Sequence, residues 1–133
     1  LLARYLIGTT AAEIVSVLLA LIGHNWPIFL KFRGGRGIAT GLGGLSIMAP
    51  IAALCAAAAF IPVTLVSKYV SLGSIVGVLT ACLTLVGLTL LGIYSADYSW
   101  YSLIAGSIII WQHRDNIRRI WDGTERRLGK SAL

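Results

Sequence analysis

Long apolar runs separated by short polar segments dominate this chain. Between residues 38 and 66 the only ionisable side chain is that of Cys55, and between residues 69 and 96 the ionisable side chains are Cys82 and two tyrosines. Each run exceeds the roughly 20 residues that an α-helix needs to cross the hydrocarbon layer of a bilayer. The pattern therefore predicts an all-α fold, a polytopic bundle of transmembrane helices.

Pro50 divides the first of these runs. Residues 38–49 are rich in glycine and residues 51–66 are rich in alanine, so the run is either one kinked span or two short helices. A single span would separate the basic residues at 31–36 from the six at 113–130. Two helices instead leave only Arg4 apart from the other basic residues, in agreement with the tendency of Lys and Arg to lie on the cytoplasmic side. We therefore predict about five membrane segments, at 5–22, 38–49, 51–66, 70–94 and 100–112.

Composition favours the same class of protein. Apolar residues make up 57% of the chain and charged residues 12%, against roughly 45–50% and about 25% in soluble domains. The net charge of +6 does not indicate nucleic-acid binding, because the basic residues flank apolar spans, where they would meet anionic headgroups. Cys55 and Cys82 lie inside apolar runs and are predicted to pack against other helices, without a disulfide or a metal. Glu13 lies inside the segment 5–22, so it should face other helices or a water-filled cavity, unless this segment is not a full span.

A glycine-rich segment precedes the span at 38–49. Gly34, Gly35 and Gly37 surround Arg36, and glycine adopts the backbone angles that let successive N–H groups point at one anion. The N-terminus of the following helix and the forked guanidinium would add positive potential. These features predict a phosphate site, but a turn that permits close helix packing explains them equally well. His24, earlier in the segment, is expected to be buried and hydrogen-bonded.

Two further polar segments carry candidate chemistry. His113 and Asn116 are three residues apart, so on a helix they would emerge together at the end of the last apolar span. A histidine there can exchange protons near neutral pH, although an interfacial amphipathic helix explains the His113 and Asn116 pair slightly better and Arg119, Arg126 and Arg127 clearly better. The stretch 67–74 is rich in hydroxyl groups. It could form a third wall of a site through Ser71 and Ser74, but its spacing favours a simple helix cap.

In combination, these segments resemble the bacterial acyl-phosphate-dependent glycerol-3-phosphate acyltransferases. The first segment is similar to a motif of that family at Gly23-His24, Pro27, Phe32, Gly34-Gly35-Arg36-Gly37 and Ala39-Thr40. The second is similar to another of its motifs at His113-Arg114, Asn116-Ile117, Arg119, Gly123 and Glu125. The order and separation of the motifs agree over essentially the whole chain.

The resemblance implies transfer of a fatty acyl group from acyl-phosphate to the 1-hydroxyl of glycerol 3-phosphate, which gives lysophosphatidate and phosphate. It implies no cofactor and no metal, and its partners are the two substrates and membrane lipids. His113 and Asn116 would be catalytic, and His24 and Glu125 would support the structure. Glu125 would brace the arginines. The expected phosphate-binding residues are Gly34, Gly35, Arg36, Gly37, Thr40, Ser71, Ser74 and Arg114.

The chain also differs from the family pattern in two places, and the resemblance implies a cellular location. The family usually has lysine where this chain has Arg36, and it begins with another transmembrane helix and a serine-bearing motif that this sequence does not match. Residues 1–133 are therefore expected to form one transmembrane domain, the last two-thirds of a fold with about seven helices, and to be incomplete as an enzyme. The location would be the bacterial inner membrane, with the polar segments facing the cytoplasm. The alternatives are an inactive truncated acyltransferase and a non-enzymatic module such as a transporter fragment.

Overall fold

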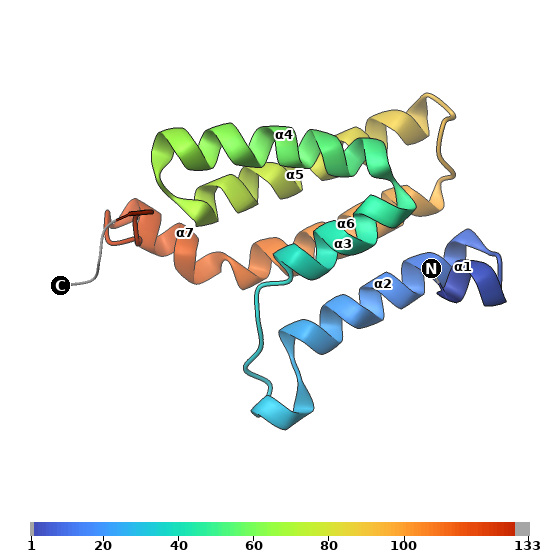
Figure 1. Cartoon of the computed structure of the whole chain (residues 1–133), viewed down its shortest axis with the longest axis horizontal. Helices are drawn as coiled ribbons and strands as arrows, with labels where there is room; N and C mark the ends of the chain where they lie inside the picture. The colour runs from blue at the N-terminus through green and yellow to red at the C-terminus, as the bar shows by residue number, and fades with distance from the viewer. Residues whose placement is uncertain (1, 130–133) are drawn as a thin grey trace.

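The computed structural model describes residues 2–129, which form seven α-helices and one short 3-10 helix (Figure 1). Within this part of the chain there is no strand, which confirms the all-α prediction. The helices are α1 (Leu2–Leu6), α2 (Thr10–Asn25), η1 (Ile28–Leu30), α3 (Ile38–Met48), α4 (Pro50–Ser67), α5 (Val70–Leu90), α6 (Asp97–Gln112) and α7 (Arg114–Trp121).

The helices run back and forth between two ends of the bundle. The long helices α4 and α5 form an antiparallel hairpin, and α6 packs against α5 (Figure 1). Helix α3 packs between α2 and α4, and α2 also contacts α6. The turn between α4 and α5 lies at the same end as α7, whereas the connection between α5 and α6 lies at the opposite end (Figure 1).

The division of the run 38–66 into two helices is confirmed. Helix α3 ends at Met48, and Pro50 opens α4 at its first position, where a missing backbone N–H leaves no hydrogen bond unmade. The phenol of Tyr98, in the first turn of α6, donates to the Met48 carbonyl over 3.3 Å. At the other end the Leu128 N–H donates to the Lys68 carbonyl over 2.7 Å. Lys68 therefore lies beside the basic C-terminal segment, as its charge predicted.

Helices occupy all five predicted membrane segments, but their lengths differ. The stretch Thr10–Leu30 and the helices α4 and α5 are long and apolar enough to cross a membrane. Helix α3 has 11 residues and α6 has 16, so α6 rises only about 24 Å against about 30 Å of hydrocarbon. The two shorter helices pack against neighbouring helices, α3 against α2 and α4, and α6 against α2 and α5, which satisfies the expectation for a segment too short to cross alone.

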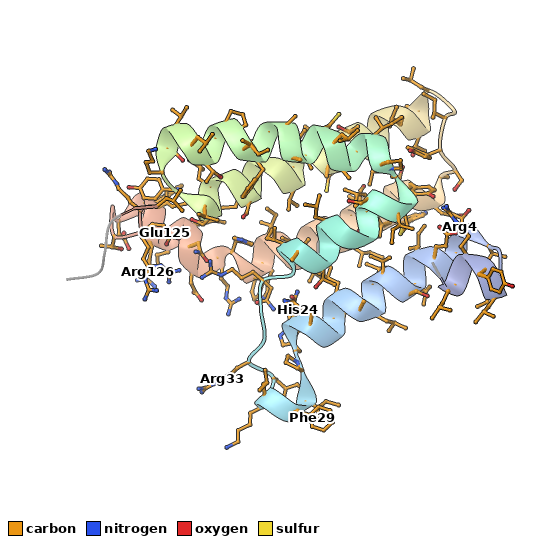
Figure 2. All side chains as sticks on the ribbon, viewed as in Figure 1. Arg4, His24, Phe29, Arg33, Glu125 and Arg126 are labelled. Carbon is orange, nitrogen blue, oxygen red and sulfur yellow. The ribbon has the colours of Figure 1, made fainter. Side chains whose placement is uncertain are left out.

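The first predicted segment, 5–22, is wrong in its boundaries. Gly8 adopts a left-handed φ of 71°, and the Thr9 side chain accepts a hydrogen bond from the Ala12 N–H over 3.3 Å. These two residues end α1 and begin α2, which then continues to Asn25. The Glu13 carboxylate is almost buried and accepts a hydrogen bond from Arg4 over 3.0 Å. Arg4 lies at the end of the bundle opposite Glu125 and Arg126 (Figure 2).

Candidate functional site

Three segments that are far apart in the sequence meet around one polar cavity at the α7 end of the bundle. The cavity has a volume of about 750 Å³. Figure 2 shows Glu125 and Arg126 at this end, beside the turn between α4 and α5. The polar lining of the cavity comes from the residue pair before α3, from α5 and from the chain after α6. It consists of Arg36, Ser71, Ser74, His113, Asn116, Arg119, Thr124, Glu125, Arg126 and Arg127.

The carboxylate of Glu125 joins two of these segments, α5 and the chain after α6. Its Oε1 accepts hydrogen bonds from Ser71 Oγ and Asn116 Nδ2, both over 2.7 Å, and its Oε2 accepts one from Arg119 Nε over 2.8 Å. The side chain is only 7% exposed. Burial alone would raise the pKa of this carboxyl, but the three donors outweigh burial and hold the pKa below its usual value. Glu125 is therefore ionised at neutral pH, and it fixes the positions of α5 and α7 relative to each other.

His113 lies at the junction of α6 and α7 and is 1% exposed. A hydrogen bond of 2.8 Å joins its Nδ1 to the Ile109 carbonyl oxygen, and since a carbonyl can only accept, Nδ1 carries the proton. The neutral ring therefore has its lone pair on Nε2. Burial, assisted by the nearby charge of Arg36, lowers the pKa of His113 below its ordinary value. The imidazole is consequently neutral at pH 7 and can accept a proton at Nε2.

Asn116 presents an unused acceptor. The residue is 1% exposed, and its Nδ2 is bonded to Glu125. Its Oδ1 is buried without a hydrogen-bond partner, a situation that costs about 1–3 kcal/mol for a buried polar group. Because Glu125 holds this side chain at the cavity wall, Oδ1 is its one polar atom that is left without a hydrogen-bond partner.

The glycine-rich loop differs from the predicted nest. The N–H of Gly34 donates to the Asn25 carbonyl and that of Gly35 to the His24 carbonyl, both over 3.2 Å. These two N–H groups satisfy the C-terminus of α2, so the expectation that they are free to bind a phosphate is wrong. A Cβ at either glycine would collide with α2, at the His24 carbonyl or the His24 ring. The two glycines therefore permit a close approach of loop and helix, which was the alternative interpretation.

The positive end of α3 remains at the cavity. Gly37 precedes this helix with a φ of 79°, no side chain caps the first turn, and Arg36, immediately before Gly37, lines the cavity. Asn25 is a further candidate that was not predicted: it is 1% exposed, has no partner for its side-chain amide and lies next to Gly37. No motif position in the sequence marked this residue.

Three other predicted site residues lie elsewhere. Arg114 stands over the Trp111 ring at 5.1 Å and donates to the Trp111 carbonyl, so the structure does not bring its guanidinium into the cavity. Thr40 is half-buried in the first turn of α3 and does not line the cavity. His24 is exposed, so the expectation that its ring is buried is wrong.

Three arginines that were expected to contact lipid headgroups line the cavity instead. Arg119, Arg126 and Arg127 line the cavity, and Arg127 Nε also donates to the Tyr69 hydroxyl over 3.0 Å. The chain turns at His113, where α6 gives way to α7. A second turn follows α7, where Gly123 has a φ of 68°. The two turns place the later arginines at the cavity, and continuous helical spacing could not reveal them.

A second cavity, of about 300 Å³, adjoins the polar one. Ile38, Phe60 and Ser74 line both cavities. The rest of its wall is almost entirely apolar and comes from α3, α4, α5 and α6. The polar cavity therefore continues into an apolar one within the helix bundle.

The loop geometry predicts a clear effect on stability. Alanine at Gly37 would be strained at a φ of 79°, and its Cβ would meet the Leu21 side chain and come within 2.9 Å of Asn25 Oδ1. We expect Gly37→Ala to destabilise the protein by about 1–3 kcal/mol, seen as a lower unfolding temperature in detergent. A Cβ at Gly43, inside α3, would meet nothing within 4 Å. Gly43→Ala should therefore leave stability unchanged or raise it, and equal losses in both variants would contradict the assigned loop geometry.

Comparison with known proteins gives a consistent result. Residues 1–123 match the family model described as glycerol-3-phosphate acyltransferase. The chain is 45% identical to the glycerol-3-phosphate acyltransferase of Thermoanaerobacter sp. (strain X514) over 132 residues, which cover 99% of this chain and 64% of that relative. It is 44% identical to glycerol-3-phosphate acyltransferase 3 of Dehalococcoides mccartyi (strain CBDB1) over 121 residues, 91% of this chain and 56% of that relative. The chain thus spans less than two-thirds of the length of these curated relatives.

Solved structures share the arrangement of helices. The glycerol 3-phosphate form of PlsY (YgiH), an integral membrane glycerol 3-phosphate acyltransferase, superposes with a TM-score of 0.85 at 31% identity, over 96% of this chain and 62% of that one. Its lysophosphatidic acid form gives a TM-score of 0.75 at 29% identity, over 89% of this chain and 67% of that one.

Proposed function

The chain belongs to the glycerol-3-phosphate acyltransferase family that its motifs predicted, and we propose that its polar cavity is the site of acyl transfer to glycerol 3-phosphate. The donor would be an acyl-phosphate, and the products would be lysophosphatidate and phosphate. The observation that carries the proposal is the junction of a basic polar cavity with an apolar one. This shape fits a substrate with an anionic head and a hydrocarbon tail. That two neighbouring structures are glycerol 3-phosphate and lysophosphatidic acid forms supports it.

The two phosphate groups would bind among the arginines of the polar cavity. Arg36 stands at the positive end of α3, which favours an anion, and Arg126 lines the same cavity. Arg119 is already held by Glu125 and Arg127 by Tyr69, so these two guanidinium groups are fixed in place before substrate binds. Fixed cations offset the repulsion between two phosphates at low cost in side-chain entropy.

The transfer step requires little covalent chemistry from the protein. The hydroxyl oxygen of glycerol 3-phosphate attacks the acyl carbon, the new ester C–O bond forms, and the bond from that carbon to the phosphate oxygen breaks. The departing phosphate keeps the electron pair. The hydroxyl proton passes to His113 Nε2 or to a substrate phosphate. Since glycerol 3-phosphate has two hydroxyl groups, one can donate to Asn116 Oδ1 while the reacting 1-hydroxyl faces His113.

The integral membrane placement follows from the apolar helices and the PlsY-like fold, and the orientation is a further part of the proposal. Arg36, Lys68 and the arginines of 114–127 gather towards the cavity end, and Arg4 lies at the other. Lys130 lies outside the described residues. By the preference of basic residues for the cytoplasmic side, the cavity would face the cytoplasm of a bacterial inner membrane.

Replacement of Arg36 tests the location of the site. We expect Arg36→Ala to raise the KM for glycerol 3-phosphate by about 10- to 100-fold, because a hydrogen bond to a charged group contributes about 1.5–3 kcal/mol. Initial rates of label incorporation into lysophosphatidate at varied glycerol 3-phosphate would measure it. Arg33→Ala is the matched control, since Arg33 belongs to the same loop but points away from the bundle (Figure 2). An unchanged KM in Arg36→Ala, or equal changes in both variants, would contradict the phosphate assignment.

A non-enzymatic membrane module was the alternative, and its main support was Glu13 within a membrane segment. The structure pairs Glu13 with Arg4, away from the polar cavity. The Glu13 carboxylate is therefore not left free to serve a solute path. The other support, the break near Pro50, is a helix boundary with proline at the first position of α4, where proline is common in any helix.

A further inference from the structure

The apolar cavity extends along α3, α5 and α6, away from the polar cavity. On α5 its lining begins at Ser74, which also lines the polar cavity, and ends at Leu85. On α3 it runs from Ile38, likewise shared, to Leu45. Helix α6 runs the opposite way, so its residue farthest from the polar cavity is Tyr101. From Ser74 to Leu85 the helix rises about 16 Å.

Small residues make up the middle of this cavity. Gly77 and Ala81 on α5 and Ala105 and Gly106 on α6 line it, and Gly77 lies against Ala56 and Phe60 of α4. A Cβ at Gly106 would come within 2.7 Å of Cys82 Sγ, which shows how closely the two helices approach. The absence of larger side chains at these positions leaves room for a chain of methylene groups on the side where α5 and α6 meet α3 and α4.

Large buried side chains close the far end. Leu45 is 5% exposed, Leu85 is 1% exposed and Tyr101 is 4% exposed. They come from three different helices and belong to the same buried cluster as Met48 and Ala52, which lie farther from the polar cavity. The end is therefore closed by the packed core of the bundle and not by one movable side chain.

We infer that Leu45, Leu85 and Tyr101 set the length of the acyl chain that the protein transfers, an inference that rests on the proposed function. The carbonyl of the acyl group must reach the polar cavity, so the tail is measured from a fixed point. Leu45, Leu85 and Tyr101 form the floor of the cavity. When the methyl end of the acyl chain meets this floor, any further methylene groups must lie outside the cavity. Methylene groups that are pushed towards the polar cavity leave an apolar environment, which is unfavourable, so selectivity should fall beyond one chain length.

Substitution at the floor tests this inference. The protein, expressed from its complete gene and reconstituted in lipid, would be assayed with saturated acyl-phosphates that differ by two carbons. We expect Leu85→Ala, which deepens the cavity, to move the optimum of kcat/KM to longer chains by at least one member of the series. Ala81→Val narrows the middle and should move it to shorter chains. The control is Leu83→Ala on the same helix, where the side chain is 74% exposed, and its optimum should equal that of the unmodified protein.

The outcomes separate the two proposals. An active protein whose chain-length optimum is the same in Leu85→Ala, Ala81→Val and the control overturns the inference and leaves the proposed function intact. An unmodified protein that makes no lysophosphatidate from any member of the series overturns both. Opposite shifts in the two cavity variants, with none in Leu83→Ala, are the result that the cavity geometry predicts.

Discussion

His113→Ala is expected to lower the kcat for acyl transfer by about 10²- to 10⁴-fold, the range that a positioned general base contributes. The Nδ1–H is held by the Ile109 carbonyl at 2.8 Å, so the ring cannot turn freely and its Nε2 stays available as the proton acceptor. The KM for glycerol 3-phosphate should change much less, because the arginines hold the phosphate. Steady-state kinetics on the purified variant would give both constants.

The dependence of the rate on pH separates a base from a merely structural histidine. Only the neutral imidazole accepts a proton, so kcat should fall as the pH drops through the pKa of His113. Burial places that pKa below the ordinary value for histidine, so the fall should come on the acid side of neutrality. In His113→Ala this limb of the profile should disappear. If the variant keeps the same limb, or if kcat is unchanged, His113 is not the proton acceptor.

Glu125→Ala should have the largest effect on the structure of the site. The substitution leaves Ser71 Oγ and Asn116 Nδ2 without their acceptor and Arg119 without its partner. Breaking a buried charged pair costs about 3–5 kcal/mol. Because Arg119 is 40% exposed, we expect the free energy of unfolding to fall by an amount at the lower end of this range, about 3 kcal/mol. Activity should fall as well, since Asn116 is no longer held. Unfolding in detergent and the transfer assay would measure the two effects.

Asp122 provides the matched control for Glu125. Its contact with Arg118 is 3.9 Å long, and both side chains are largely exposed, so Asp122→Ala should change stability by less than about 1 kcal/mol. The pKa of Glu125 is lowered in the folded state, so its contribution is present at neutral pH and is lost as the pH falls through that lowered pKa. A Glu125→Ala variant as stable as Asp122→Ala would contradict the central position of this carboxylate.

Much of the fold was predictable because its determinants are local. The apolar runs placed all five membrane segments, and Pro50 with the position of Lys68 divided the ambiguous run correctly. The boundary errors at α2 came from a single left-handed glycine and its threonine cap. These signals are weak in a sequence where glycine also occurs inside helices.

The site was less predictable because its determinants are distant. That Arg36, Ser71, His113, Asn116 and Glu125 share one cavity agrees with the expectation of a common polar surface. The fate of the Gly34 and Gly35 N–H groups depended on where the end of α2 lies. That Arg119, Arg126 and Arg127 line the cavity, and Arg114 does not, depended on the turns at His113 and after α7. Neither feature has a sequence signal of its own, since both arise from contacts between segments.

The most direct test of the account is the product formed by the protein itself. The protein, expressed from its complete gene and reconstituted in proteoliposomes, would be given acyl-phosphate and labelled glycerol 3-phosphate, and its lipids would be resolved by mass spectrometry. The account predicts labelled lysophosphatidate in a reaction that needs acyl-phosphate and is lost in His113→Ala. Uptake of solute without labelled lysophosphatidate would contradict it, and label that forms equally well in His113→Ala would contradict the role of His113 as the proton acceptor.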